Sequence, residues 1–368
     1  MELLGYLRPD GRVGVRNHVV VIYSVECAKV VARRIADRYE GTHLFGPRTG
    51  CYWNQPIWEK LVALGQHPNV AAALVVGLGC EYMEAPALAA EIAKSGKPTR
   101  SLVITESGGT RRSITEGTKL LEELHRESER VVRTSLSISD LVVAMDCAGS
   151  DATSGLASNP AVGHAADLLI DAGATVYLFD IDEELIGLGN VLEARAVSPE
   201  TAARLRSAVP DLDPPIPNLG NVRGGITTYR EKAAGALSKG GTRPIRGVVD
   251  TFQCPEEHGL YLEVIVPGSN EGVSDPQCAM QMAACGAHIV VETTGVGTVT
   301  GGVVAPVIKV CANPKTCARL ADDMDVDLSD LMQGKADIAA GGHRVLDTIL
   351  AVAAGMPTCS EDLGHFED

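Results

Sequence analysis

Four cysteines are the residues of this sequence best suited to chemistry, because each follows a predicted strand or extended stretch and most stand near glycine. They are Cys27, Cys51, Cys80 and Cys147. In open α/β sheets the ligand crevice lies outside the carboxyl ends of the strands, so residues far apart in sequence can meet there. Converging thiolates would suit a soft or borderline metal, including iron or an iron–sulfur cluster.

The same cysteines have a second interpretation as packed side chains. Cysteine is commonly buried as a small hydrophobic residue, and none of the four belongs to a CxxC pair. Cys278 and Cys285 stand seven apart on a predicted helix, which is the spacing of core positions. We interpret the later cysteines as structural, and Cys254 remains open. The later group is Cys278, Cys285, Cys311, Cys317 and Cys359.

Two turns rich in small residues could bind an anion. Residues 106–110 read Glu-Ser-Gly-Gly-Thr, and residues 149–155 read Gly-Ser-Asp-Ala-Thr-Ser-Gly. Glycine turns and helix N-termini present backbone N–H groups to carboxylates, although each turn could equally be a plain helix cap. The arginines Arg8, Arg12 and Arg16 recur every four residues, and one of them could bind a carboxylate with two hydrogen bonds. The alternative for each is a solvated loop position.

Alternating helix and strand patterns must position these residues. The first half predicts strands near 19–25, 70–76, 101–105, 141–145 and 175–179, with helices at 28–39, 85–93, 113–127 and 161–172. The second half predicts strands near 247–251, 261–266, 289–292 and 307–310, with helices at 228–238 and 342–354. This alternation predicts an α/β fold with a doubly wound, mostly parallel sheet of the Rossmann or flavodoxin type.

A stretch rich in Pro, Gly and Asn over 210–225 predicts a domain boundary. We expect an α/β domain over 1–215 that carries the cysteine site, and a smaller α/β domain over 216–368 that completes the pocket.

Composition narrows the class of protein. The net charge of −15 argues against a nucleic-acid binder and against a protein of anionic membranes. The start of the chain lacks the pattern of a signal peptide, and no apolar run is long enough to span a bilayer. We therefore expect a cytoplasmic enzyme with reduced thiols.

A series of short motifs runs along nearly the whole chain in a specific order and spacing. They are residues 5–17 (GYLRPDGRVGVRN), 49–51 (TGC), 77–81 (GLGCE), 107–110 (SGGT), 149–151 (GSD) with Asn159-Pro160, 224–228 (GGITT) with Glu231-Lys232, and 353–355 (AAG) with Ser360-Glu361. In these motifs the chain resembles the large domain of the altronate/galactarate dehydratase family of hydro-lyases.

The resemblance implies a lyase that acts by dehydratase-type β-elimination on a small hydroxy acid or on a sugar acid such as altronate or galactarate. It also implies iron, for which we predict Cys51, Cys80 and Cys147 as ligands and Cys27 as a fourth candidate. For the substrate we predict Arg16 and Asn17, the turn Gly108-Gly109-Thr110, and Ser150 with Asp151. Three residues are candidates for the general base: Glu106, Glu81 and Lys309.

Many family members carry an additional small N-terminal domain, fused or separate. The resemblance therefore implies a separate small subunit, and we also expect a homo-oligomer. Tyr52, Trp53, the neighbours of Cys147 and Val296 depart from the usual pattern of sugar-acid members.

These departures keep three alternatives open. One is a sulfo-lyase acting on sulfolactate as a large subunit, and another is a non-catalytic α/β protein that binds sugar acids. A nicotinamide-dependent oxidoreductase is the third, although the sequence has no clean dinucleotide fingerprint.

Overall fold

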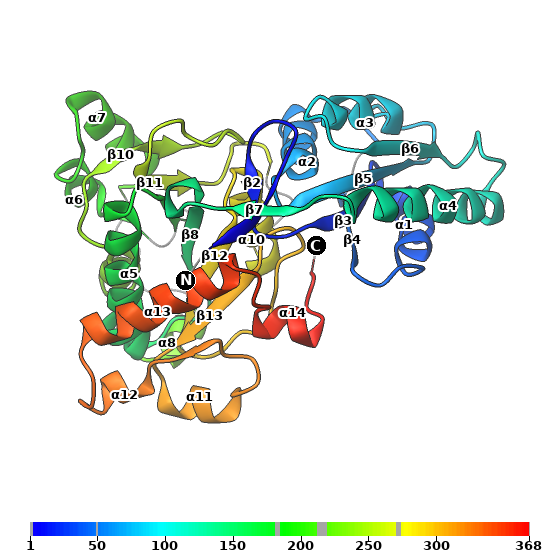
Figure 1. The fold of residues 1–368 in the computed structure, drawn as a ribbon. Coiled ribbons are helices and arrows are strands. Elements are labelled where there is room, and N and C mark those ends of the chain that lie inside the picture. Colours follow the sequence, from blue (N-terminus) through cyan, green and yellow to red (C-terminus); the bar gives the residue numbers. More distant parts are fainter. Residues whose placement is uncertain (1–2, 49–50, 181–184, 212–218, 270–273, 368) are drawn as a thin grey trace.

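The computed structural model describes residues 3–48, 51–180, 185–211, 219–269 and 274–367 of the chain (Figure 1). These residues form two parallel sheets covered by helices and one small antiparallel sheet. The predicted α/β fold with parallel sheets is confirmed.

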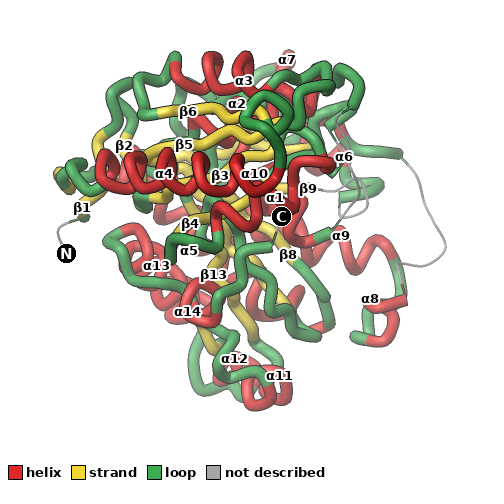
Figure 2. The backbone as a smooth tube through the Cα atoms, turned by 90° about the vertical axis from the view of Figure 1, so that its right-hand side faces the viewer, coloured by secondary structure: helices red, strands yellow, loops and turns green. Residues whose placement is uncertain are grey.

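The first parallel sheet has four strands in the order β4-β3-β5-β6. The strands are β3 (His18–Tyr23), β4 (Thr42–Phe45), β5 (Val70–Gly77) and β6 (Thr99–Val103). Its helices are α1 (Lys29–Ala36), α2 (Gln55–Gln66), α3 (Ala85–Ala93) and α4 (Thr110–Ser128). The apolar stripes of α1 and α4 cover one face and those of α2 and α3 cover the other, so β5 is buried along its whole length. Figure 2 shows α4 lying across the front of β3 and β5.

The second parallel sheet has seven strands in the order β10-β11-β9-β8-β12-β13-β14. They are β8 (Val142–Cys147), β9 (Thr175–Asp180), β10 (Ile245–Val249), β11 (Gly259–Val264), β12 (Ile289–Thr294), β13 (Val307–Cys311) and β14 (Val326–Asp327). Helices α5 (Asn159–Asp171) and α13 (Ile338–Ala353) cover one face, and α10 (Asp275–Ala284) covers the other.

Strands from the first half of the chain are thus divided between the two sheets. β8 pairs with β12 and β9 pairs with β11, both from the second half of the chain. The side chains of β8 and β9 are apolar on both faces of the sheet, and α5, α13 and α10 cover those faces. The predicted domain boundary between residues 215 and 216 lies outside the described residues, and it stays a prediction.

One apolar core joins the two sheets. Side chains of α2 and α3 from the first sheet and of α10 from the second belong to the same buried cluster. Asn69, just before β5, adds a polar tie: its Oδ1 accepts from the backbone N–H of Val15, and its Nδ2 donates to the carbonyls of His288 and Val304.

The remaining elements are short. The antiparallel sheet contains β1 (Leu4–Leu7), β2 (Val13–Gly14) and β7 (Arg133–Ser135). The other helices are α6 (Gly189–Glu193), α7 (Pro199–Ala208), α8 (Leu219–Arg223), α9 (Tyr229–Leu237), α11 (Pro314–Arg319), α12 (Ser329–Met332) and α14 (Cys359–Leu363). Single turns are η1 (Glu26–Ala28), η2 (Ile138–Asp140), η3 (Ser154–Ser158) and η4 (Ser238–Gly240).

Candidate active site

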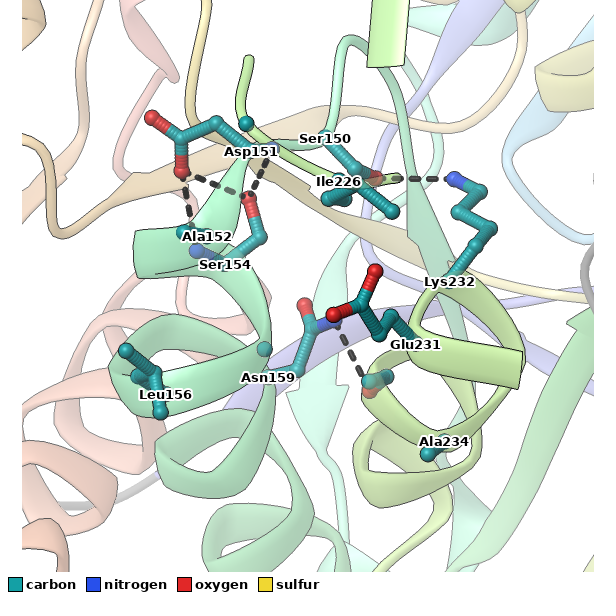
Figure 3. A pocket seen from close by; sticks show the side chains of 13 residues that line it. Ser150, Asp151, Ala152, Ser154, Leu156, Asn159, Ile226, Glu231, Lys232 and Ala234 are labelled. Carbon is teal, nitrogen blue, oxygen red and sulfur yellow. Dashed lines mark hydrogen bonds between the residues drawn. The ribbon is translucent and has the colours of Figure 1, made fainter. Parts of the chain in front are cut away.

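The carboxyl end of β8 opens into a cavity of about 380 Å³ (Figure 3). The loop after the strand forms one wall together with η3 and the start of α5, and helix α9 with the residues before it forms the other. The lining residues are Ser150, Asp151, Ala152, Ser154, Gly155, Leu156, Asn159, Gly225, Ile226, Glu231, Lys232, Ala234 and Gly235. The position agrees with the general rule that ligands bind at the carboxyl edge of parallel sheets.

Lys232 is the cation of this cavity. Its side chain comes from α9 and is buried, with 7 % of its surface exposed. The Nζ atom donates to Ser150 Oγ at 2.8 Å and lies 3.5 Å from Cys147 Sγ. A buried ammonium beside a hydroxyl and a thiol can hold an anionic group and stabilise negative charge that develops on it.

The start of α9 is fixed by a capping box. Thr228 accepts from the backbone N–H of Glu231, and Glu231 Oε2 accepts from the backbone N–H groups of Thr227 and Thr228. Hydrogen bonds from Thr227 are the main reason that the pKa of Glu231 is lowered. Glu231 is therefore ionised at neutral pH, and Figure 3 shows its carboxylate between α9 and Asn159.

Asp151 organises the loop rather than presenting a free carboxylate. Its Oδ1 accepts from the backbone N–H groups of Thr153 and Ser154, and its Oδ2 accepts from Asn313 Nδ2 at 2.7 Å. A Cβ on Gly295 would lie 2.0 Å from Asp151 Oδ1, so the end of β12 must be glycine here. The carboxylate thereby ties the loop after β8 to the end of β13 and packs closely against the residue that follows β12.

A row of charged residues lies beneath the cavity on the face of the sheet that α10 covers. Asp146, Glu292 and Lys309 are direct neighbours in register on β8, β12 and β13, and all three are buried. Burial, with the nearby charges of Asp275 and Asp146, raises the pKa of Glu292 well above its usual range. Lys239 Nζ lies 3.9 Å from Asp146 Oδ1. Lys309, predicted as a base, donates to the Thr300 carbonyl and does not line the cavity.

A second cavity, also of about 380 Å³, lies at the carboxyl edge of the four-stranded sheet. It brings together three predicted site residues: Cys80, Glu81 and Glu106. Glu81 is buried and serves its own loop, since Oε1 accepts from Ser24 Oγ at 2.7 Å and Oε2 accepts from the backbone N–H groups of Gly79 and Cys80. Burial raises the pKa of Glu81, but these hydrogen bonds outweigh it and the net pKa is lowered.

The four cysteines predicted as metal ligands are divided between the two sheets. Cys51 is beside Cys80, because its carbonyl accepts from the backbone N–H of Tyr82. Cys27, Cys51 and Cys80 are exposed, whereas Cys147 is buried against Lys232 at the other sheet. Over the part of the chain that the structure describes, no three His, Cys, Asp or Glu side chains gather as a metal-binding group. The cysteine set as predicted therefore does not fit one iron ion.

The predicted substrate residues near the N-terminus have structural partners. Arg16 forms a bidentate ion pair with Glu361: its Nε and Nη2 atoms each lie 2.7 Å from one carboxylate oxygen. This pair links the N-terminal segment to α14. Asn17 accepts from Arg8 and donates to the Ser128 carbonyl. Both lie outside the two cavities, and their role in substrate binding stays a prediction.

The predicted turn Gly108-Gly109-Thr110 opens α4. Gly108 and Gly109 have φ of 83° and 90°, a backbone conformation that favours glycine, and Gly109 is the N-cap residue. The turn follows Glu106, so it borders the second cavity without lining it. Ser150 and Asp151 are the predicted substrate residues that line the first cavity.

Lys232 and Asn159 were not predicted as site residues, although both belong to motifs that carry the family resemblance. Asn159 Nδ2 donates to the Gly235 carbonyl, and Oδ1 accepts from Thr293 Oγ1. The signal that could have found Lys232 is its place after a capping box, because the fourth residue of a capped helix points back across the preceding loop.

Parallel sheets with a polar cavity at a carboxyl edge define the class of protein as an α/β enzyme. The C-terminal region of D-galactarate/altronate dehydratase matches residues 138–368, and the second domain of D-galactarate dehydratase/altronate hydrolase matches residues 5–129. The chain belongs to the D-galactarate/altronate dehydratase family, as the sequence motifs predicted.

Curated relatives agree with this assignment. The chain is 32% identical to the (2R)-sulfolactate sulfo-lyase subunit beta of Chromohalobacter salexigens, over 99% of this chain and 95% of that protein. It is 29% identical to the altronate dehydratase of Escherichia coli, over 98% and 75% of the two chains. It is 30% identical to the galactarate dehydratase (L-threo-forming) of the same organism, over 95% and 72%. The predicted class of enzyme, a lyase, is thereby confirmed.

The sequence predicts no apolar run long enough to span a bilayer, and the helices of the structure allow a check of this prediction. Among the described residues, no helix has the length and apolar character needed to cross a bilayer.

Proposed function

We propose that this chain catalyses β-elimination from a small hydroxy acid or sugar acid at the cavity beside β8. One observation carries the proposal: the buried Lys232 ammonium lies 2.8 Å from Ser150 Oγ inside a cavity of about 380 Å³ at the carboxyl edge of the larger sheet. The relatives named as altronate and galactarate dehydratases support this reaction class.

Lys232 and Ser150 hold the substrate carboxylate in this proposal. When the proton on the carbon next to the carboxylate leaves, negative charge moves onto the carboxylate oxygens, and the fixed ammonium stabilises that charge. Glu231 lines the same cavity as an ionised carboxylate and accepts the proton. The C2–H and C3–O bonds break, the C2=C3 double bond forms, and the hydroxide leaves as water with the proton that Glu231 took from C2, which returns Glu231 to its ionised form.

The test is turnover by the full chain, together with any subunit that copurifies, on a panel of hydroxy acids. Formation of a 2-oxo acid or an unsaturated acid is followed by absorbance. Turnover that disappears in Lys232→Met supports the proposal. Ligand-induced thermal stabilisation without turnover of any acid would instead favour a non-catalytic sugar-acid binder. Release of sulfite from sulfolactate would identify the alternative leaving group, which the name of the Chromohalobacter relative suggests.

Iron remains a prediction from the family resemblance, and no step above depends on it. Metal analysis of anaerobically purified protein, and of Cys51→Ser, Cys80→Ser and Cys147→Ser variants, tests it. Iron retained by wild type and lost from one variant would identify the ligand. Full activity after chelation would contradict the prediction.

We also propose that the chain works with a separate small subunit, as a homo-oligomeric assembly in the cytoplasm. The support is the relative that matches over 95% of its length and is named as a subunit. Copurification of tagged chain from its native cells, followed by mass spectrometry, tests this.

A further inference from the structure

Two cysteines that the proposed reaction does not use lie against each other beneath helix α11. Cys311 ends β13 and Cys317 lies in α11, so the chain turns back on itself over residues 312–316. The Cys317 thiol donates to the Cys311 carbonyl at 3.4 Å, and both side chains belong to one small apolar cluster with Met324. Both cysteines are free thiols. This arrangement places two reduced sulfur atoms at the ends of one short loop.

Contact between the thiols makes them chemically unequal. The hydrogen bond from the Cys317 thiol is the largest cause of the lowered pKa of Cys311, and the same bond raises the pKa of Cys317. The thiolate is the reactive form of cysteine towards oxidants. Cys311 is therefore the thiol that reacts first, and Cys317 is placed to react with its product.

The pair lies in a part of the fold that needs little energy to open. Helix α11 has six residues, and it stands with α12 at the lower edge of the molecule (Figure 1). The cluster beneath it contains only three buried residues, Cys311, Cys317 and Met324. Short elements with few buried apolar contacts open locally at much less than the cost of global unfolding. A molecule as small as hydrogen peroxide can therefore reach the thiols while the sheet stays intact.

The loop between the two cysteines also holds the cavity beside β8. Asn313 Nδ2 donates to Asp151 Oδ2 at 2.7 Å, and Thr316 Oγ1 donates to the Gly295 carbonyl at 2.7 Å. Asp151 in turn fixes the loop that brings Ser150 into the cavity. A change in the distance between the cysteines is thus transmitted to the cavity through one side-chain hydrogen bond.

We propose that Cys311 and Cys317 are a modification site: a peroxide converts them to a reversible disulfide, and the disulfide lowers activity at the cavity beside β8. The effect on activity rests on the function proposed above, whereas the disulfide does not. A disulfide brings the sulfur atoms to about 2.05 Å, which is far inside their contact distance. Helix α11 then shifts towards β13, and Asn313 moves away from its position against Asp151.

The oxidation balances with one peroxide molecule. The Cys311 thiolate attacks a peroxide oxygen, the O–O bond breaks, and a sulfenic acid and one water form. The Cys317 thiol then attacks the sulfenic sulfur, the S–S bond forms, and a second water leaves. Two thiols thereby lose two electrons and two protons to the peroxide, and a thiol such as glutathione reverses the reaction by exchange.

Peptide mass spectrometry of the full chain, with any copurifying subunit, tests the disulfide. Trypsin cleaves after Lys309, Lys315 and Arg319, so it separates the two cysteines. After treatment with hydrogen peroxide and alkylation of the remaining thiols, we expect peptides 310–315 and 316–319 to be recovered as one linked species. Dithiothreitol should separate them. This measurement uses the wild-type protein, so it does not depend on the folding of a variant.

Steady-state kinetics on a hydroxy acid that the protein turns over test the effect on activity. Oxidation should lower kcat/KM at least about tenfold, because misplacement of a binding group by about 1 Å can cost up to about 100-fold, and dithiothreitol should restore it. Cys311→Ala should remove this loss of activity. Cys27→Ala, the same change at an exposed cysteine, should keep it.

Each outcome decides a different claim. Oxidation of the exposed cysteines without the linked peptides would overturn the modification site. Linked peptides with an unchanged kcat/KM would overturn the effect on the cavity. If untreated protein turns over no hydroxy acid, the proposed function fails, whereas linked peptides in the same protein would still establish the disulfide.

Discussion

The two parallel sheets present very different carboxyl edges. At the seven-stranded sheet, Cys147 and Lys232 are buried, and the neighbouring carboxylate of Asp151 is held by hydrogen bonds from its own loop and from Asn313. At the four-stranded sheet, Cys27, Cys51 and Cys80 are exposed, whereas Glu81 is enclosed. A low local dielectric strengthens electrostatic interactions. The same charged residue therefore stabilises a substrate charge more at the buried edge of the seven-stranded sheet than at the exposed edge of the four-stranded sheet.

The largest effect should come from removing the buried cation. Lys232→Met should lower kcat/KM by about 1,000-fold, because the charge that develops on the substrate carboxylate loses its partner. Steady-state kinetics measure this. Lys94→Met, at the exposed lysine that follows α3 beside the four-stranded sheet, is the matched control and should change little. An equal loss of kcat/KM in both variants would show that the two sheet edges do not differ in their importance for catalysis.

Thiol reactivity should separate the edges next. Cys80 should react with iodoacetamide about 100-fold faster than Cys147 in the native protein, because alkylation of a buried thiol requires local opening. Quenched labelling with peptide mass spectrometry measures both rates. Activity should survive labelling of Cys80. If activity is lost at the same rate as Cys80 is labelled, the active site lies at the four-stranded sheet and not at the cavity beside β8.

Glu263 offers a pH test of burial at the larger sheet. Burial raises its pKa from 4.5 to about 8. Between these pH values the folded protein keeps a proton that the unfolded chain has lost, so this group lowers the free energy of unfolding as pH rises. Glu263→Gln should flatten the decline by a few kcal/mol, measured by denaturant unfolding at pH 5 and pH 8. The same slope in wild type and variant would show that Glu263 titrates normally.

The smallest effect concerns the enclosed part of the four-stranded edge. Ser24→Ala removes the 2.7 Å hydrogen bond to Glu81 and should cost about 1–3 kcal/mol of stability. Thermal denaturation measures it, with Ser207→Ala at an exposed serine as control. A change limited to that of the control would mean that the backbone N–H groups alone hold Glu81.

Local patterns predicted the elements well and the assembly less well. Apolar runs such as 70–76 predicted β5 closely, since a strand buried on both faces has no polar alternation to confuse it. Helix α2 was missed, because the charged Lys60 occupies a position on its buried face between Ile57 and Leu61. The division of strands between two sheets depends on contacts between distant segments, which periodicity does not contain.

For the site, the sequence predicted one group of residues, and the structure divides it: Ser150, Asp151 and Cys147 lie at one edge, and Cys80, Glu81 and Glu106 lie at the other. It could not tell that these are separate cavities. It also assigned Arg16 to the substrate from its residue type, whereas its partner Glu361 lies 345 positions away. Such a pairing is fixed only by the tertiary fold.

The amide of Asn69 limits how the molecule can be divided or moved. It ties the start of β5 to Val15 and to two segments of the other sheet, and it is fully buried. A fragment that ends near residue 129 would keep Val15 but leave the Asn69 amide nitrogen unsatisfied beside an uncovered apolar face. The single Asn69 side chain therefore holds the amino ends of the two sheets against each other, so its loss would be felt in both sheets at once.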